Sequence, residues 1–187
     1  FDVVLVEPGL YGAMNAKNRG IKNVICATTH TAKFQSGTIP SIGVFDVVEH
    51  IEDDIGFLKH LYELLVPGGI LYLTVPAYQF LWSQDDIHAG HFRRYSLAQI
   101  KEKLLKSGFK ISYSTYIFVF LPFFVFFFRT LRFYLKLNNN SCDDNTRHKK
   151  DHSYRLGIVG KLLNFFMNFE LNRIESKNSI FLGGSCM

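Results

Sequence analysis

The chain has 187 residues and a mass of 21.5 kDa, a length that fits one domain with a sizeable core. With 48% hydrophobic and 20% charged residues the composition is globular, which excludes a disordered, collagen-like or disulfide-stapled chain. Three cysteines without a C-x-x-C pair form neither a disulfide framework nor a zinc motif, so a reducing cytoplasm is the expected compartment.

The net charge of +5 is unevenly distributed along the chain. Residues 1–92 hold 5 basic and 10 acidic side chains, whereas residues 93–187 hold 16 basic and 6 acidic ones. Because the basic excess lies beside a phenylalanine-rich run, we expect no nucleic-acid partner.

Short apolar runs alternate with helical patterns over the first 116 residues, which is typical of βαβ units and a parallel sheet. Pro67-Gly68-Gly69 ends one helix abruptly, and a capping box at Ser96 and Gln99 begins the next. The predicted strands are 3–6, 23–27, 42–48, 70–75 and 110–116, and the predicted helices are 11–18, 53–65 and 97–107.

Three segments at predicted strand ends are candidates for a ligand-binding site, because ligands of doubly wound sheets bind at the carboxyl ends of strands. Glu7 follows the first strand, where a carboxylate can accept hydrogen bonds from both hydroxyls of a ribose. Asp46–Asp54 gathers acids and one histidine between a strand and a helix. Leu65–Pro76 combines a helix end, a tight turn and a strand.

This series resembles the class I, Rossmann-like S-adenosylmethionine-dependent methyltransferases. Glu7 matches the acidic end of the family's second strand, Asp46–Asp54 its DVxEHIxDD segment and Leu65–Pro76 its LxPGGxLxLTVP segment. Leu81–Tyr95 resembles the LWSxxDxxxxHxRRY segment of a narrower bacterial group that acts on small molecules or glycans. The resemblance covers residues 1–116, with a looser match at 179–187.

The resemblance implies an α/β fold with a doubly wound, mostly parallel sheet in a single domain, 1–187. Its core would be 1–116 and 178–187, with a helical, aromatic and basic insertion at 117–177 before the last strand. The chain opens at Phe1 inside an apolar run, so we interpret it as lacking its natural N-terminus. The family's first strand and glycine-rich cofactor loop would precede Phe1.

The resemblance also implies S-adenosylmethionine as the cofactor. We favour a ribose-binding role for Glu7 over that of an exposed strand-end carboxylate. The family often has an acid facing the adenine where this chain has Cys26-Ala27-Thr28-Thr29, so we expect a threonine to replace it. The expected cofactor-binding residues are Glu7, Pro8, Thr28, Thr29, Asp46, Val47, Val48 and Glu49.

His50 and His91 are the candidate catalytic residues. Imidazole titrates near neutrality, so His50 suits a general base that deprotonates an acceptor hydroxyl. A structural role is the alternative for His50, and Glu49 and His50 can also cap and charge the following helix. We assign Glu52, Asp53 and Asp54 to that helix N-terminus.

The segment after the fourth predicted strand is the candidate acceptor side, and we predict no metal there. A tryptophan offers a stacking face and arginines pair with phosphate or carboxylate groups. The predicted substrate-binding residues are Trp82, His88, Arg93 and Arg94; alternatively, Arg94 and Tyr95 anchor the segment on the sheet. His88 and His91 with Asp85 and Asp86 have the chemistry of metal ligands but lack a third firm ligand.

Residues 111–128 carry no charge, and Arg129, Arg132 and Lys136 follow them. Because Pro122 interrupts this run, an element lying in the membrane plane fits better than a spanning helix. We expect residues 117–137 to contact an anionic membrane or to form a homodimer face, and a buried helix is the alternative. The expected location is the cytoplasm, with peripheral attachment at the inner membrane face kept open.

The expected function is S-adenosylmethionine-dependent methyl transfer to a hydroxyl or carboxyl of a small, lipid-linked or saccharide-linked acceptor. The alternative is a degenerate, non-catalytic family member that acts as a binding or scaffold subunit.

Overall fold

The computed structural model describes residues 2–119, 122, 126 and 158–187. It divides into two compact units, one built from residues 1–42 and 63–70 and the other from residues 43–62 and 71–187. Each unit is described by itself below.

The first unit opens with a β-α-β motif. Strand β1 (Val4–Val6) and strand β2 (Asn23–Ile25) pair in parallel, with Val4 opposite Asn23 and Val6 opposite Ile25. Helix α1 (Leu10–Asn18) connects them and buries Ala13 and Ala16, which lie three residues apart on one helical face. The predicted strands and helix of this region are therefore confirmed, with ends shifted by at most two residues.

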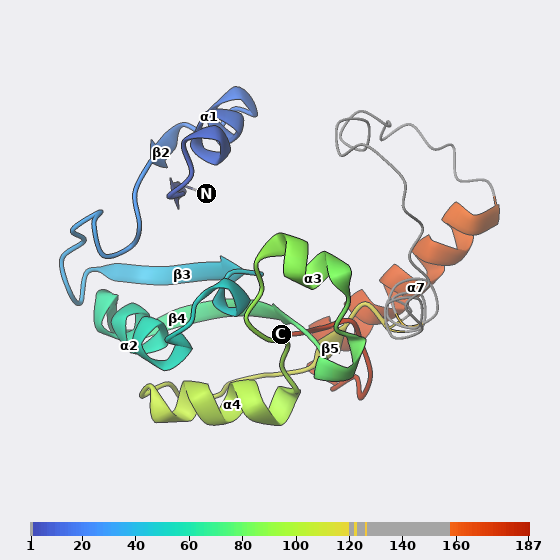
Figure 1. The fold of residues 1–187 in the computed structure, drawn as a ribbon. Helices are drawn as coiled ribbons and strands as arrows, with labels where there is room; N and C mark the ends of the chain where they lie inside the picture. Colours follow the sequence, from blue (N-terminus) through green and yellow to red (C-terminus); the bar gives the residue numbers. More distant parts are fainter. Residues whose placement is uncertain (1, 120–121, 123–125, 127–157) are drawn as a thin grey trace. The chain divides into compact units, whose positions relative to one another are not determined.

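The larger sheet has the order β3-β4-β6-β5. Strand β3 (Ile39–Phe45) and strand β4 (Leu65–Pro76) run in the same direction (Figure 1). Strand β6 (Ser185–Cys186) is antiparallel to β4 and to β5 (Tyr116–Ile117), with Cys186 opposite both Val75 and Tyr116. The α/β architecture with mostly parallel long strands is as predicted.

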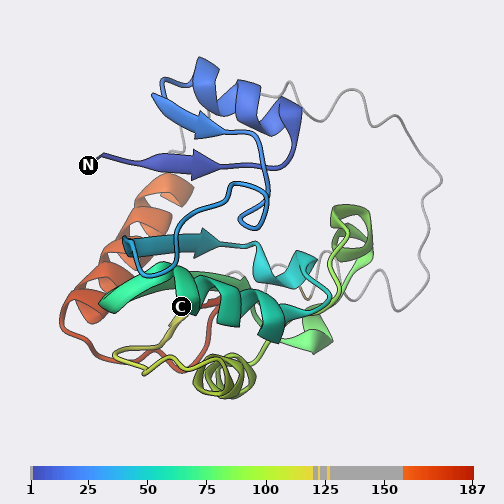
Figure 2. The same cartoon turned by 90° about the vertical axis from the view of Figure 1, so that its left-hand side faces the viewer.

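Among the described residues, four helices and two short 3-10 turns belong wholly or largely to the second unit. Helices α2 (Asp54–Leu64) and α4 (Leu97–Lys106) lie side by side, and α4 is seen end-on in Figure 2. The ring of Tyr62 on α2 meets that of Phe109, which follows α4, with centroids 5.2 Å apart. The remaining elements are η1 (Val48–His50), η2 (Gln79–Leu81), α3 (Gln84–Ala89) and α7 (Ile158–Glu175).

The core of the second unit lies between the sheet and these helices. Its buried side chains come from β3, β4, α2, η2, α4 and the segment before α4: Val44, Val75, Leu58, Leu61, Leu81, Ile100 and Tyr95. This apolar core fixes the carboxyl ends of β3 and β4, from which the polar segments described below project.

Three strand predictions were wrong in their bounds. Strand β4 begins at Leu65 rather than at residue 70, so the turn predicted at Pro67-Gly68-Gly69 lies within the strand. Strand β3 ends at Phe45 rather than residue 48, because Asp46 adopts a left-handed φ of 52° and the chain then enters η1. Of the strand predicted at 110–116, only Tyr116 belongs to β5, which pairs with the two residues of β6.

The capping box of α4 was predicted correctly. The Ser96 hydroxyl accepts from the Gln99 N–H at 3.3 Å, and Gln99 Oε1 accepts from the Ser96 N–H at 2.8 Å. Helix α4 accordingly begins at Leu97.

Only part of the predicted insertion at 117–177 falls within the described residues. This part includes Ile117, which belongs to β5, and the helix α7. The predicted surface at 117–137 lies for the most part outside them. Among the described helices, none is both long enough and apolar enough to cross a membrane.

Candidate functional site

In the first unit, Glu7 follows β1 at the start of α1. Its own N–H donates to the Ile25 carbonyl at 3.0 Å, and the Gly9 N–H donates to Glu7 Oε1 at 2.8 Å. A Cβ on Gly9 or Gly12 would lie only 2.9 Å or 2.8 Å from the Glu7 side chain. Glycine at these two positions therefore gives the carboxylate room to lie against the first turn of the helix.

The segment after β2 carries Thr28 and Thr29. The Thr28 N–H donates to Thr31 Oγ1 at 2.9 Å, and the Thr31 N–H donates back to Thr28 Oγ1 at 3.1 Å. The Thr28 hydroxyl is thus engaged in a local turn. Nearby, the Cys26 thiol lies 3.9 Å from the Pro8 carbonyl, which brings the segments after β1 and β2 together.

In the second unit, the chain turns sharply where β3 ends. The Asp46 N–H donates to the Thr74 carbonyl at 3.0 Å, and the Thr74 hydroxyl donates to Asp46 Oδ1 at 3.1 Å. The left-handed backbone of Asp46 then directs Val48 and Glu49 inward, where both are almost fully buried, and leaves Val47 and His50 exposed.

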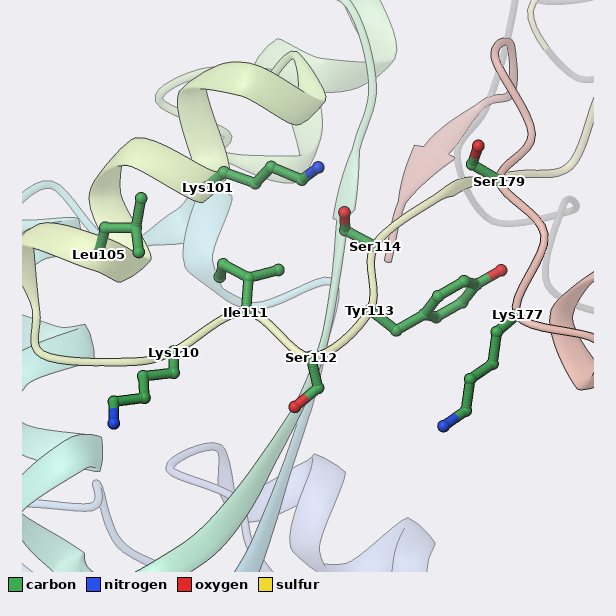
Figure 3. A pocket seen from close by; sticks show the side chains of 9 residues that line it. All are labelled: Lys101, Leu105, Lys110, Ile111, Ser112, Tyr113, Ser114, Lys177 and Ser179. Carbon is green, nitrogen blue, oxygen red and sulfur yellow. The ribbon is translucent and has the colours of Figure 1, made fainter.

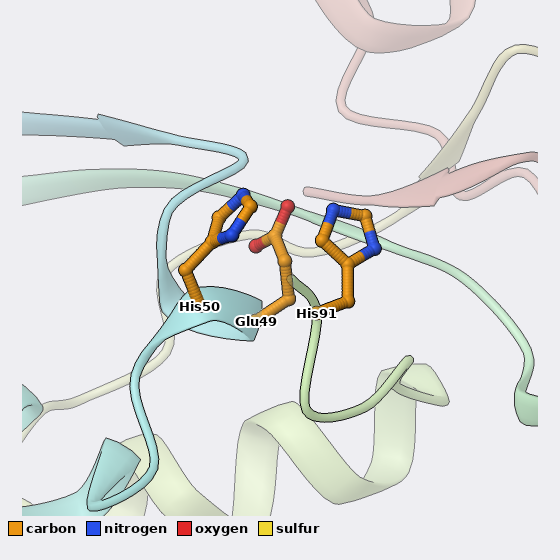
Figure 4. Close-up of side chains that lie close together, drawn as sticks. All are labelled: Glu49, His50 and His91. Carbon is orange, nitrogen blue, oxygen red and sulfur yellow. The ribbon is translucent and has the colours of Figure 1, made fainter. Parts of the chain in front are cut away.

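Glu49, His50 and His91 converge at this turn (Figure 4). The His50 and His91 rings meet edge to face, with centroids 4.6 Å apart, and Glu49 lies between them in the view shown. The loop that carries His91 is held in place by the Phe92 N–H, which donates to the Glu49 carbonyl at 2.8 Å. Residues 41 positions apart in sequence thus form one cluster.

Burial controls the protonation of this cluster. Glu49 is 1% exposed, and desolvation raises the pKa of its carboxyl to about 7. Burial and the neighbouring His91 lower the pKa of His50 below its usual value. Proton-accepting groups at this turn are therefore available at neutral pH.

Asp86 fixes the loop around this cluster. Although fully buried, it accepts from Arg94 Nε at 2.7 Å, from the Ser83 N–H at 2.8 Å and from His91 Nδ1 at 2.8 Å. Despite burial, these donors, with Arg94 first among them, hold the Asp86 pKa below its usual value, so the carboxylate is ionised. Because an ionised carboxylate only accepts, His91 Nδ1 carries the proton and Nε2 is the free ring nitrogen when the ring is neutral.

A second buried carboxylate, Asp54, connects α2 to α4 and to the segment that precedes α4. It accepts from Arg93 at 2.7 Å, from Lys103 at 2.9 Å and from the buried Tyr95 hydroxyl at 2.9 Å. The sequence pattern places Asp54 only at the helix N-terminus, so these tertiary contacts go beyond the prediction. The adjacent Asp53 does serve that end, since its Oδ1 accepts from the Gly56 N–H at 2.9 Å.

A family comparison identifies the class of protein to which these residues belong. A model described as a methyltransferase domain matches residues 1–113, more than half of the chain. The chain belongs to this methyltransferase family. The predicted family is therefore confirmed at this level, while the narrower bacterial, glycan-associated group stays a prediction.

The chain also resembles a solved structure. This is phosphoethanolamine N-methyltransferase 2 of Haemonchus contortus in complex with S-adenosyl-L-methionine, with 16% identity and a TM-score of 0.43. The alignment covers 94% of the present chain and 45% of the other, so the chain spans less than half of that protein's length. No curated protein sequence matches the chain.

The predicted acceptor-side residues have different surroundings. Trp82 is half-buried after η2, and His88 is exposed on α3, 3.3 Å from the Gln84 amide. Arg93 and Arg94 are bound to Asp54 and Asp86, which is the anchoring arrangement weighed for Arg94 above. Substrate binding by these four residues stays a prediction.

Another surface feature of the chain is an open hollow beside α4 (Figure 3). Its basic side chains are Lys101 on α4, Lys110 after that helix and Lys177 after α7. None of the predicted site residues lines it. The hollow is therefore separate from the Glu49 cluster.

We expect Asp54→Asn to lower the free energy of unfolding at pH 7 by about 2 kcal/mol, because the charge-assisted bonds from Arg93 and Lys103 are lost. Despite the opposing effect of burial, these cations lower the folded-state pKa of Asp54. Its stabilisation is thus present above an unfolded pKa of about 3.9 and lost as pH falls through the folded value.

Urea unfolding at a series of pH values measures this effect. The difference between wild type and Asp54→Asn should shrink below about pH 4. A difference that stays constant down to pH 2 would contradict the ionised state of Asp54.

Proposed function

We propose that the protein transfers a methyl group from S-adenosylmethionine to an oxygen of its acceptor. The observation that carries this proposal is the methyltransferase-domain match over residues 1–113. Together with the family motifs, it favours S-adenosylmethionine as the donor. The chemistry is an in-line displacement: the acceptor oxygen bonds to the methyl carbon, the sulfur–methyl bond breaks, and S-adenosylhomocysteine leaves with the electron pair.

The cofactor assignments fall on both units, and each is proposed on its own residues. In the first unit, the Gly9 N–H orients the Glu7 carboxylate, which suits it to accept from a ribose diol. Pro8 follows β1, as Glu7 does, and Thr28 and Thr29 follow β2. In the second unit we assign the turn at 46–49 to the cofactor.

We propose the acceptor oxygen to be a hydroxyl or a carboxyl of a small, lipid-linked or saccharide-linked molecule. A carboxylate is already ionised at neutral pH, whereas a hydroxyl must lose a proton as it attacks. The convergence of Glu49, His50 and His91 favours the hydroxyl, because it provides groups that can receive that proton. His50 and His91 are accordingly proposed as catalytic residues.

Trp82, His88, Arg93 and Arg94 are proposed to bind the acceptor. Arg93 and Arg94 would bind the acceptor while they keep their bonds to Asp54 and Asp86.

Peripheral membrane contact or dimer formation through 117–137, in a cytoplasmic protein, is a further proposal that stands on the sequence.

Calorimetric titration of the full-length protein with S-adenosylmethionine and S-adenosylhomocysteine tests the cofactor assignment. We expect Glu7→Ala to weaken binding roughly 5- to 150-fold, because loss of hydrogen bonds to a charged partner costs about 1–3 kcal/mol. Unchanged affinity would remove Glu7 from the cofactor site.

Glu7→Gln is the matched control for this experiment. Its amide oxygen can still accept from the Gly9 N–H, so the start of α1 is preserved while the charge is lost. Binding by Glu7→Gln should lie between wild type and Glu7→Ala. Equal melting temperatures of the two variants would show that the loss does not reflect unfolding.

The acceptor is sought by incubating the protein with methyl-labelled S-adenosylmethionine and a total metabolite and lipid extract. Label released as methanol by alkali indicates a methyl ester, and alkali-stable label on oxygen indicates an ether from a hydroxyl. Cofactor binding without any transfer of label would favour the non-catalytic binding subunit instead.

A further inference from the structure

The Glu49 carboxylate has a feature that proton transfer alone does not explain. Its Oε2 atom is buried and has no hydrogen-bond partner among the residues that the structure describes. A buried carboxylate oxygen without a hydrogen bond destabilises the fold, so such an atom calls for a ligand. The nearest candidate groups are the two histidines that face it.

We propose that Glu49, His50 and His91 bind a divalent transition-metal ion. Each of the three offers one ligand atom, and these atoms all lie within 4.8 Å of one another. Ligands about 2.1 Å from a tetrahedral ion are roughly 3.4 Å apart, so small side-chain rotations would close the site. His50 is exposed, which leaves its ring room to make this movement.

The surroundings of both histidines fit metal ligation. His91 donates from Nδ1 to Asp86, which leaves Nε2 as the ligand atom, and Arg94 in turn holds Asp86. This carboxylate–imidazole arrangement is the usual support of a metal-bound histidine. The His50 ring interacts with the backbone carbonyls of Ala89 and Gly90, which can hold one ring nitrogen as a donor and free the other.

The donor set indicates the kind of ion. Two imidazoles and one carboxylate suit Zn²⁺ and neighbouring first-row ions, whereas Mg²⁺ and Ca²⁺ prefer oxygen ligands. The negative charge of Asp46 acts on Glu49 and adds attraction for a cation, whereas the charges of Asp86 and Arg94, which also act on Glu49, oppose each other. Three protein ligands leave a tetrahedral ion one open position, which a water or a substrate oxygen can occupy.

This site differs from the metal chemistry considered in the sequence. That set joined His88 and His91 to Asp85 and Asp86, whereas the structure places His88 beside Gln84 and uses Asp86 to orient His91. The binding site stands independently of methyl transfer. A role for the ion in acidifying an acceptor hydroxyl rests on the proposed function.

Zinc binding is measured by calorimetry on chelator-treated, full-length protein without S-adenosylmethionine, so the result does not depend on methyl transfer. A Cys26→Ser, Cys142→Ser background removes competing thiols from outside the cluster. We expect one Zn²⁺ per chain, and Co²⁺ in its place should give the visible absorption bands of a four- or five-coordinate ion.

Variants assign the ligands. Glu49→Gln and His91→Ala should each weaken Zn²⁺ binding by more than the roughly 10- to 100-fold expected for the supporting variant Asp86→Asn. His88→Ala should bind as the background protein does. Melting temperature, raised by Zn²⁺ only in proteins that bind it, provides a second readout.

Two results would overturn the proposal. One is the absence of stoichiometric Zn²⁺ and Co²⁺ binding by the folded background protein. The other is binding that survives Glu49→Gln and is lost in His88→Ala, which would place the ion on the other set of residues.

Discussion

Replacing Asp86 with alanine should lower the free energy of unfolding by about 3–5 kcal/mol. Arg94 has a side chain only 10% exposed, and its guanidinium makes two bonds to Asp86, at 2.7 Å and 3.1 Å. Without the carboxylate, the Ser83 N–H and His91 Nδ1 would lose their partner. The buried guanidinium would keep its bond to the Ala77 carbonyl at 3.3 Å but lose its ion pair. The expected loss exceeds that for Asp54, whose cationic partners are 29% and 26% exposed and can reach water.

Urea unfolding followed by tryptophan fluorescence suits this measurement. The chain has a single tryptophan, Trp82, which immediately precedes Ser83 and therefore reports on the unit that contains Asp86. Asp86→Asn should recover part of the loss because the amide oxygen can still accept from Arg94.

Glu102→Ala is the control for removal of an acidic residue. Glu102 forms an ion pair with Lys106 on α4, but both side chains are more than half exposed, at 64% and 60%. Its removal should leave the unfolding midpoint unchanged within error. An equally small effect of Asp86→Ala would contradict the structural role assigned to that carboxylate.

Local patterns predicted the parts of the fold that local interactions determine. The capping box of α4 joins two residues that are three positions apart, and the helix begins where this pattern places it. The end of β3 escaped prediction because the left-handed conformation of Asp46 interrupts an otherwise strand-like run. Strand β5 is short because its pairing depends on β6, about 70 residues further along the chain.

The candidate site was also predictable only in part, because some of its contacts join residues far apart in the sequence. The acidic turn at 46–54 could be placed at a strand end from its position alone. By contrast, Asp54 meets Arg93 and Lys103, and Asp86 meets Arg94, through tertiary contacts that no sequence period encodes. The same holds for the approach of His91 to Glu49, which depends on the Phe92–Glu49 backbone bond.

The second large effect concerns catalysis by His91. We expect His91→Ala to reduce methyl transfer to a hydroxyl acceptor by about 10²- to 10⁴-fold, the usual contribution of a positioned proton-transfer group. Nε2 is the atom that matters, whether it receives the proton or binds the proposed ion, because Nδ1 is committed to Asp86. The affinity for S-adenosylmethionine should change less than about 2-fold, since that histidine is not assigned to the cofactor.

His91→Asn separates this catalytic role from a structural one. Its side-chain amide can donate to Asp86 in place of Nδ1–H, but nothing replaces Nε2 on the side facing Glu49. If Nε2 acts in catalysis, His91→Asn should be as inactive as His91→Ala while melting at the temperature of the wild type. Recovery of activity by His91→Asn, or parallel loss of methyl transfer and cofactor affinity in both variants, would instead show that His91 supports the loop. Rates are measured with labelled donor and the acceptor found in the extract experiment, so that the chemical step and donor binding are determined on the same protein.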